Sequence, residues 1–156
     1  MILKLRQRMT RDESGFTLVE LLVVMLILGL LAAIAIPAFF NQRDKAKDAD
    51  AKTAVRTAET SMETYGTDHD GLYTPTPVAD DLQKIEPTLN NVVDADLTIV
   101  STDDSYSVTV HQPDTGNYFQ ISRDTLGQTS LTCDDTDGSG AGGTGNAGCP
   151  DGGNWG

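Results

Sequence analysis

The chain has 156 residues and a formal net charge of −12 at pH 7. This length allows one domain with an anchor, and the negative charge argues against nucleic acid as a direct partner of the whole surface. The charge is uneven, because residues 1–15 carry a net charge of +2 and the rest of the chain carries −14.

A long uncharged stretch follows the basic N-terminus. Residues 21–40 contain no charged side chain and are interrupted only by Gly29 and Pro37, so the stretch can cross a hydrocarbon core about 30 Å thick. The basic residues precede it, which predicts that residues 1–15 stay in the cytoplasm and that the acidic body lies outside. An ordinary cleaved secretory signal is the alternative, but its apolar region is usually shorter and it leaves Glu20 unexplained.

Helical spacing continues beyond Pro37 on one apolar face. The pattern predicts a single helix from about residue 16 to residue 65, with Gly66 as its stop signal and charged side chains on its other faces. We expect the apolar face to pack in the core of a domain. Its members are Ala51, Val55, Ala58, Met62 and Tyr65.

The residues after Gly66 predict a small antiparallel sheet. Residues 67–77 are rich in turn formers, and residues 78–86 are a candidate short helix. Alternating β-branched and aromatic segments separated by turn signals then predict three or four strands that cover the apolar face of the long helix, an α+β fold. The predicted strands are residues 97–100, 106–110, 118–121 and 129–131.

Two cysteines bound a glycine-rich segment near the C-terminus. Cys133 and Cys149 enclose 15 residues, and export would place both in oxidising surroundings, where pairing is the default for an even count. We therefore expect a disulfide-closed C-terminal loop. In the chain-entropy model a loop of this length contributes about 3 kcal/mol to stability.

Metal binding and catalysis find little support among the remaining residues. Asp134, Asp135 and Asp137 look like the start of a calcium loop, but the distal Glu of an EF-hand is missing, so we expect a solvated acidic turn with calcium binding as the lesser alternative. His69 and His111 lack metal-ligand spacing. No phosphate loop or nucleophile elbow is present, so we expect neither an enzyme nor a cofactor.

The N-terminal residues resemble a known family. Residues 15–24, GFTLVELLVV, and residues 30–37, LLAAIAIP, closely resemble the N-terminus of type IV pilins and of the pseudopilins of type II secretion. The resemblance covers roughly residues 4–45 and joins a basic leader, a Gly–Phe junction, a Glu and a late Pro in register. It implies the pilin fold.

The resemblance also implies how the N-terminus is processed and used. A prepilin peptidase would cut between Gly15 and Phe16 and methylate the new amine of Phe16. Glu20 would then pair with that amine on a neighbouring subunit, which gives a physical reason for a carboxylate in an apolar stretch. Between Gly29 and Pro37, two helix-weakening residues, the helix can lose structure in the assembled filament of such proteins.

These observations divide the chain into five predicted parts. They are a cleaved leader (1–15), a membrane and filament-core helix (16–40), its amphipathic half (41–66), a globular part with the sheet (67–132) and a disulfide-bounded tail (133–156). We expect a subunit that polymerises into a type IV pilus with identical or related subunits, by way of the inner-membrane assembly machinery and without a specific nucleic acid. The alternatives are a type II secretion pseudopilin and a monomeric membrane-anchored binding protein.

Overall fold

The computed structural model describes residues 15–92, 96–134 and 148–156. The chain divides into an N-terminal unit, Met1–Phe39, and a C-terminal unit, Phe40–Gly156. Helix α2, Leu18–Asp68, contains 51 residues and belongs to both units. Its start lies two residues after the predicted one, and its end lies two residues beyond the predicted stop at Gly66.

Gly66 is buried in the last turns of α2 for a steric reason. A Cβ atom at this position would lie 2.8 Å from Cε1 of Tyr73, so the Tyr73 ring occupies the space that a side chain would need. The chain then reverses through Asp70, with φ 58°, and Gly71, with φ 87°. Gly66 therefore marks a close approach inside the helix and not the helix end.

Two short helical segments follow this reversal. Helix α3 spans Ala79–Ile85, and its start is supported by the backbone N–H of Val78, which donates to Oδ2 of Asp81 at 3.2 Å. The 3-10 helix η1 spans Pro87–Asn91 and was not predicted. Each segment buries one leucine, Leu82 in α3 and Leu89 in η1.

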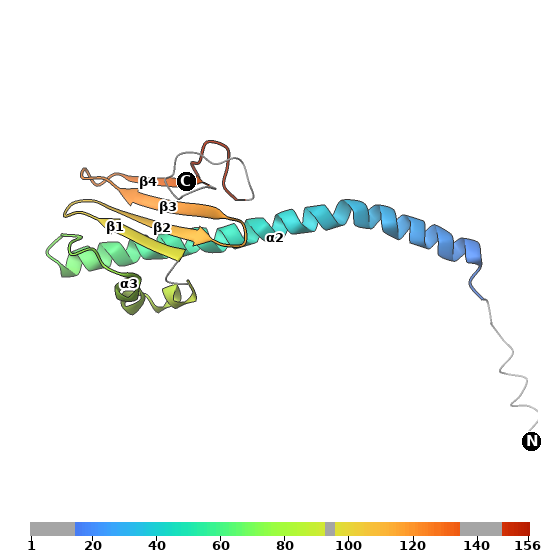
Figure 1. The fold of residues 1–156 in the computed structure, drawn as a ribbon, viewed down its shortest axis with the longest axis horizontal. Helices are drawn as coiled ribbons and strands as arrows, with labels where there is room; N and C mark the ends of the chain where they lie inside the picture. The colour runs from blue at the N-terminus through green and yellow to red at the C-terminus, as the bar shows by residue number, and fades with distance from the viewer. Residues whose placement is uncertain (1–14, 93–95, 135–147) are drawn as a thin grey trace, which may run out of the picture. The chain divides into compact units, whose positions relative to one another are not determined.

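The strands form a four-stranded antiparallel sheet with the order β1-β2-β3-β4, as Figure 1 shows. Consecutive strands are neighbours, so the connections are hairpins. Each predicted strand is present, and three of them extend at least two residues further. Their bounds are Leu97–Ser101 for β1, Tyr106–Gln112 for β2, Asn117–Arg123 for β3 and Thr129–Asp134 for β4.

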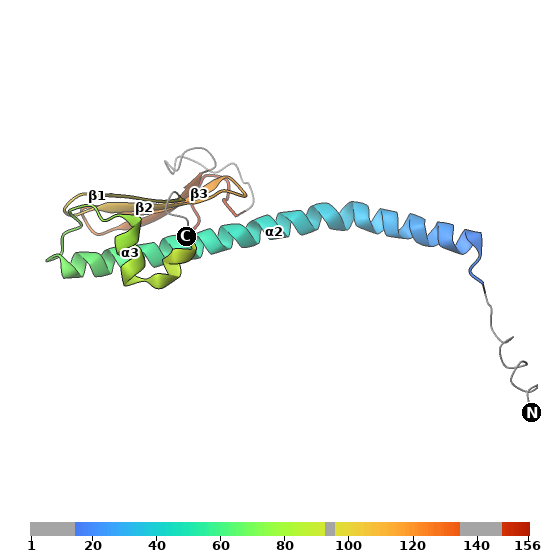
Figure 2. The ribbon, with the colours of Figure 1, turned by 60° about the horizontal axis from the view of Figure 1, so that its bottom comes forward.

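One face of this sheet packs on the C-terminal part of α2, an arrangement visible in Figure 2. The core side chains of the sheet alternate along the strands, as a half-buried sheet requires. They meet the predicted apolar face of the helix, all five members of which are buried. Fully buried side chains here include Val55, Met62, Val108, Phe119 and Ile121. The α+β prediction is confirmed.

The C-terminal residues lie along β4. Cys133 and Cys149 are joined by a disulfide, with their Cα atoms 5.8 Å apart, and both are buried. The N–H of Cys133 donates to the carbonyl of Gly153 at 2.6 Å, and the N–H of Trp155 donates to the carbonyl of Leu131 at 3.3 Å. The predicted disulfide is therefore present, and backbone hydrogen bonds hold the tail beside the strand.

Candidate assembly segment

The N-terminal end of α2 has a capped first turn. Oγ1 of Thr17 accepts a hydrogen bond from the N–H of Glu20 at 3.1 Å, and the carbonyl of Thr17 accepts from the N–H of Leu21 at 3.2 Å. Thr17 is thus the N-cap, and Glu20 stands at the third helical position, where a carboxylate interacts favourably with the helix dipole. Residues 17–20, TLVE, match the capping-box spacing, a sequence signal for this helix start.

An apolar surface follows this turn within the N-terminal unit. Large hydrophobic side chains are exposed along the helix, and Met25 is 73% exposed; Phe16, just before the helix, is exposed to the same extent. Such a surface is unusual for a protein that remains monomeric in water and marks a membrane or protein contact. Within the described residues, α2 is the one helix long and apolar enough to cross a membrane.

Gly29 and Pro37 both lie inside α2 without ending it. A Cβ atom at Gly29 would meet no described residue within 4 Å, so crowding in this part of the chain does not explain the glycine. Pro37 has no N–H to donate to the carbonyl four residues earlier, which removes one hydrogen bond from the helix. The helix in this structure continues through both positions, so its predicted weakening remains an expectation for the assembled state.

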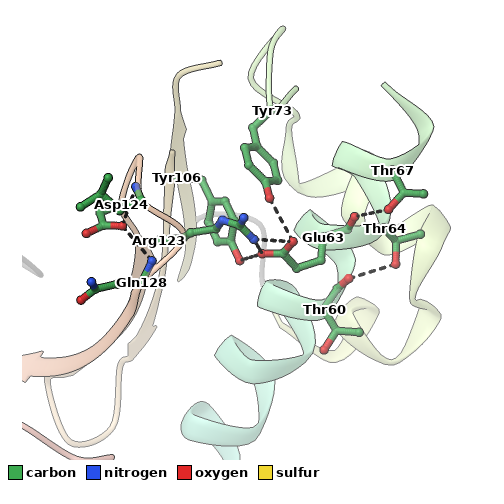
Figure 3. A network of polar contacts seen from close by, with 10 residues as sticks. Thr60, Glu63, Thr64, Thr67, Tyr73, Tyr106, Arg123, Asp124 and Gln128 are labelled. Atoms are coloured by element: carbon green, nitrogen blue, oxygen red, sulfur yellow. Dashed lines mark hydrogen bonds and ion pairs between the residues drawn. The ribbon is translucent and has the colours of Figure 1, made fainter. Parts of the chain in front are cut away.

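A second carboxylate on α2 has partners from three other segments, as Figure 3 shows. Glu63 accepts hydrogen bonds from the hydroxyls of Tyr73, at 3.0 Å, and Tyr106, at 2.8 Å. One guanidinium nitrogen of Arg123 lies 2.8 and 2.9 Å from its two carboxylate oxygens. This cluster ties α2 to the chain after its end and to strands β2 and β3.

These contacts change the proton affinities of the groups involved. Burial alone would raise the pKa of Glu63, but hydrogen bonds from Tyr106, Arg123 and Tyr73 and the charge of Arg123 together hold that pKa below its ordinary value of 4.5. Burial and the hydrogen bond to Glu63 raise the pKa of Tyr106. The cluster is therefore an ionised carboxylate held by neutral hydroxyls and a guanidinium, an arrangement that fixes structure.

The acidic residues near the C-terminus do not form a metal site in the described part of the chain. Asp134 is buried at the end of β4, whereas Asp135 and Asp137 lie outside the described residues. Among the residues that the structure describes, no group of three His, Cys, Asp or Glu side chains is placed to hold a metal ion. The histidines have other contacts: His69 stacks on Tyr65 and His111 lies 3.0 Å from Asp96.

The capped start, the carboxylate and the exposed apolar helix coincide with a recognised sequence family. Residues 10–36 match the family model described as the prokaryotic N-terminal methylation motif. The chain carries this N-terminal methylation motif. The motif includes Gly15, Phe16, Glu20 and Gly29, so four of the predicted assembly residues fall within it.

Curated relatives with this kind of N-terminus come from three groups. The type II secretion system core protein G of Pseudomonas aeruginosa is 39% identical over 59 residues, or 38% of this chain and 42% of the relative. The type IV major pilin protein PilA of Myxococcus xanthus is 41% identical over 63 residues, which are 40% of this chain and 29% of the relative. The competence protein ComGC of Halalkalibacterium halodurans is 34% identical over 62 residues, which are 40% of this chain and 61% of the relative.

The similarity is thus confined to part of each protein. The chain spans less than two thirds of the length of each of these relatives. No solved structure matches the chain. The homologues are pilins and pseudopilins that share the methylation motif, and the α+β fold of a long helix on an antiparallel sheet agrees with that similarity.

Proposed function

We propose that the protein is a structural subunit that polymerises into a type IV pilus. The observation that carries this proposal is the methylation motif over residues 10–36, together with the exposed large apolar side chains in the N-terminal part of α2. Among the described residues of a single subunit, these side chains are exposed. A bundle of identical or related helices would bury them, and burial of apolar area is the main favourable contribution to association.

Processing prepares this helix for assembly. Cleavage by a prepilin peptidase between Gly15 and Phe16 removes the basic leader and frees the amine of Phe16, which is then methylated. Thr17 follows immediately as the N-cap, so the mature protein would begin one residue before the cap. The carboxylate of Glu20, in the first turn, then pairs with the amine of Phe16 on a neighbouring subunit and sets the position of the incoming helix.

The proposed location follows from the basic residues on the N-terminal side of the apolar stretch. Before assembly the subunit spans the cell membrane once, with the leader in the cytoplasm and the C-terminal unit outside. The inner-membrane assembly machinery then transfers it into an extracellular filament. The disulfide between Cys133 and Cys149 fits this exterior location, because disulfides persist in oxidising compartments.

A pseudopilin of a type II secretion system is the second candidate function. Several relatives are named type II secretion system core protein G, including those of Pseudomonas aeruginosa and Aeromonas hydrophila. We favour the pilus because the disulfide bounds a glycine-rich C-terminal segment, whereas a fixed calcium loop would favour the pseudopilin. Both candidates are structural subunits rather than enzymes.

Deletion of the gene separates the two candidates. A pilus subunit predicts that surface filaments seen by electron microscopy disappear on deletion and return when the gene is supplied in trans, while secretion of folded exoproteins is unchanged. A pseudopilin predicts the reverse: exoproteins accumulate inside the cell and surface filaments persist. If neither filaments nor secretion change, both functions are excluded.

A further inference from the structure

A buried carboxylate outside the assembly segment holds the C-terminal residues of the chain. Asp48 lies on α2 and its exposed fraction is 0%. Its charge placed it among the side chains expected on the other faces of the helix, yet it stands three residues before Ala51 and faces the interior of the C-terminal unit. Burying a carboxylate costs free energy unless hydrogen-bond donors surround it. The donors that surround Asp48 therefore indicate its structural role.

Three donors from two other segments converge on this carboxylate. The hydroxyl of Thr115 donates to Oδ1 at 2.5 Å, and Nδ2 of Asn117 donates to Oδ2 at 2.7 Å. Thr115 lies in the connection between β2 and β3, and Asn117 is the first residue of β3. The third donor is the backbone N–H of Gly148, at 2.6 Å from Oδ2. Asp48 thus binds the residue directly before Cys149.

Gly148 is held on both of its backbone polar groups. Nζ of Lys52, one helical turn after Asp48, donates to the carbonyl of Gly148 at 2.7 Å. A Cβ atom at Gly148 would lie 2.6 Å from Cβ of Asp48, so only glycine allows this approach. We call these contacts of Asp48 and Lys52 with Gly148 the helix clasp.

The other cysteine also has non-covalent contacts. Cys133 is paired with Phe119 within the β3–β4 ladder, and its N–H donates to Gly153 at 2.6 Å. Non-covalent contacts therefore position the chain at both cysteines. The resulting Cα separation of 5.8 Å is within the range that a disulfide requires.

We propose that Asp48 is a positioning residue for disulfide formation, because the helix clasp places Cys149 beside Cys133 before the two thiols are oxidised. In that oxidation the thiols lose two protons and two electrons and form one S–S bond. A disulfide oxidant such as glutathione disulfide accepts them and becomes two thiols. The clasp raises the effective concentration of one cysteine at the other, as preorganisation does for any intramolecular step.

The test measures this effective concentration directly. The full chain in detergent micelles is equilibrated with reduced and oxidised glutathione, and the fractions of free thiol and disulfide are determined by alkylation and mass spectrometry. In Asp48→Ala both oxygens that accept from Gly148, Asn117 and Thr115 are removed, so we expect the effective concentration to fall at least about tenfold. The matched control is Asp50→Ala, which removes an exposed carboxylate from the same helix and should remain within about twofold of wild type.

Two outcomes would overturn the proposal. One is a folded Asp48→Ala protein, as judged by near-UV circular dichroism, with the effective concentration of wild type. If that variant does not fold, the second test uses the double variant Cys133→Ser, Cys149→Ser, in which Asp48 is intact and no disulfide can form. The proposal then requires the amide of Gly148 to stay protected from hydrogen exchange without the disulfide, and unprotected exchange rejects it.

Discussion

At the residue scale, Glu20 is the single charged side chain among residues 16–40. Its backbone N–H donates to Oγ1 of Thr17, so this capping hydrogen bond does not need the carboxylate. Replacing Glu20 by Ala keeps a strong helix former at this position. Removing the charge therefore keeps the cap and loses only the interaction with the helix dipole, about 0.3–1 kcal/mol.

We predict that Glu20→Ala is inserted, cleaved and folded like wild type but does not polymerise. The amine of Phe16 would enter an apolar bundle unpaired, a loss of about 3–5 kcal/mol for a broken buried pair. Sheared filament yield, measured by immunoblot against total cellular protein, checks this expectation. Glu20→Asp is the control, because it keeps the charge on a shorter side chain and should assemble better than Glu20→Ala. Normal filament yield from Glu20→Ala would show that the carboxylate has no role in assembly.

Glu63 gives a second prediction at the residue scale. Its pKa is lowered in the folded protein, so its contribution to stability is complete above the unfolded-state value of about 4.5 and is lost as the pH falls through the folded-state value. The side chain is 42% exposed, and solvent screening reduces the effect. We expect Glu63→Gln to lower the free energy of unfolding by about 1 kcal/mol at pH 7.

Urea unfolding of the full chain in detergent, from pH 7 to pH 3, measures this effect. The wild type should lose more stability below pH 4.5 than Glu63→Gln does. Glu59→Gln is a matched control one turn earlier, where burial and the charge of Glu63 raise the pKa of the carboxyl group. That control should not lower stability at pH 7. Equal acid dependence in wild type and Glu63→Gln would contradict the role assigned to this cluster.

At the scale of elements, the part of α2 between Gly29 and Pro37 is the predicted weak segment of a continuous helix. Pro37 cannot donate to the carbonyl of Ala33, and Gly29 adds conformational freedom. We predict that backbone amides in this segment exchange hydrogen faster than those in the helix on either side, and that Pro37→Ala slows their exchange. Hydrogen exchange with mass spectrometry in micelles is the measurement. Uniform exchange along residues 21–40 would mean that neither residue weakens the helix.

Local patterns predicted these elements well for a physical reason. The five apolar positions from Ala51 to Tyr65 repeat at the helical period, and the alternating segments around Val108 and Ile121 repeat at the strand period. Each repeat shows which face must be buried. The 3-10 helix η1 was missed, since its five residues are too few for any periodicity to appear.

The polar interior of the C-terminal unit could not be read in the same way. Asp48 stands three residues before Ala51, so helical spacing indicates that it is buried, but its partners and those of Glu63 lie far along the chain. Thr115 is 67 residues from Asp48, and Arg123 is 60 residues from Glu63. Helical spacing describes neighbours within one element only. Such pairs become visible only after the sheet has packed on the helix.

At the scale of the whole molecule, the two units have opposite solvent requirements. The described part of the N-terminal unit exposes its apolar side chains, whereas the C-terminal unit has a buried core of helix and sheet. The leader that precedes the apolar helix carries four basic residues. If the leader remained, these charges would have to enter any helix bundle, at a high desolvation cost.

We therefore predict that surface protein begins at Phe16. Mass spectrometry of sheared filaments should find Phe16 as the first residue, with an added methyl group on its amine. Gly15→Val should leave the leader attached and the protein in the membrane fraction, because the peptidase would meet a bulky side chain at the cut. An N-terminus at Met1, or one after residue 40, would reject the proposed processing.

The hydrogen bonds between the C-terminal tail and β4 affect how neighbouring copies of the protein can contact each other. An open strand edge offers unpaired N–H and C=O groups to any strand of another molecule. Residues 153–155 take up such groups at Leu131 and Cys133, and Thr132 forms a bridge with Asn154. When many copies stand close together, this edge offers less backbone for a neighbouring sheet to join. Contacts between C-terminal units on that side then have to be made by side chains, which allow copies to slide and separate more readily than a shared sheet would.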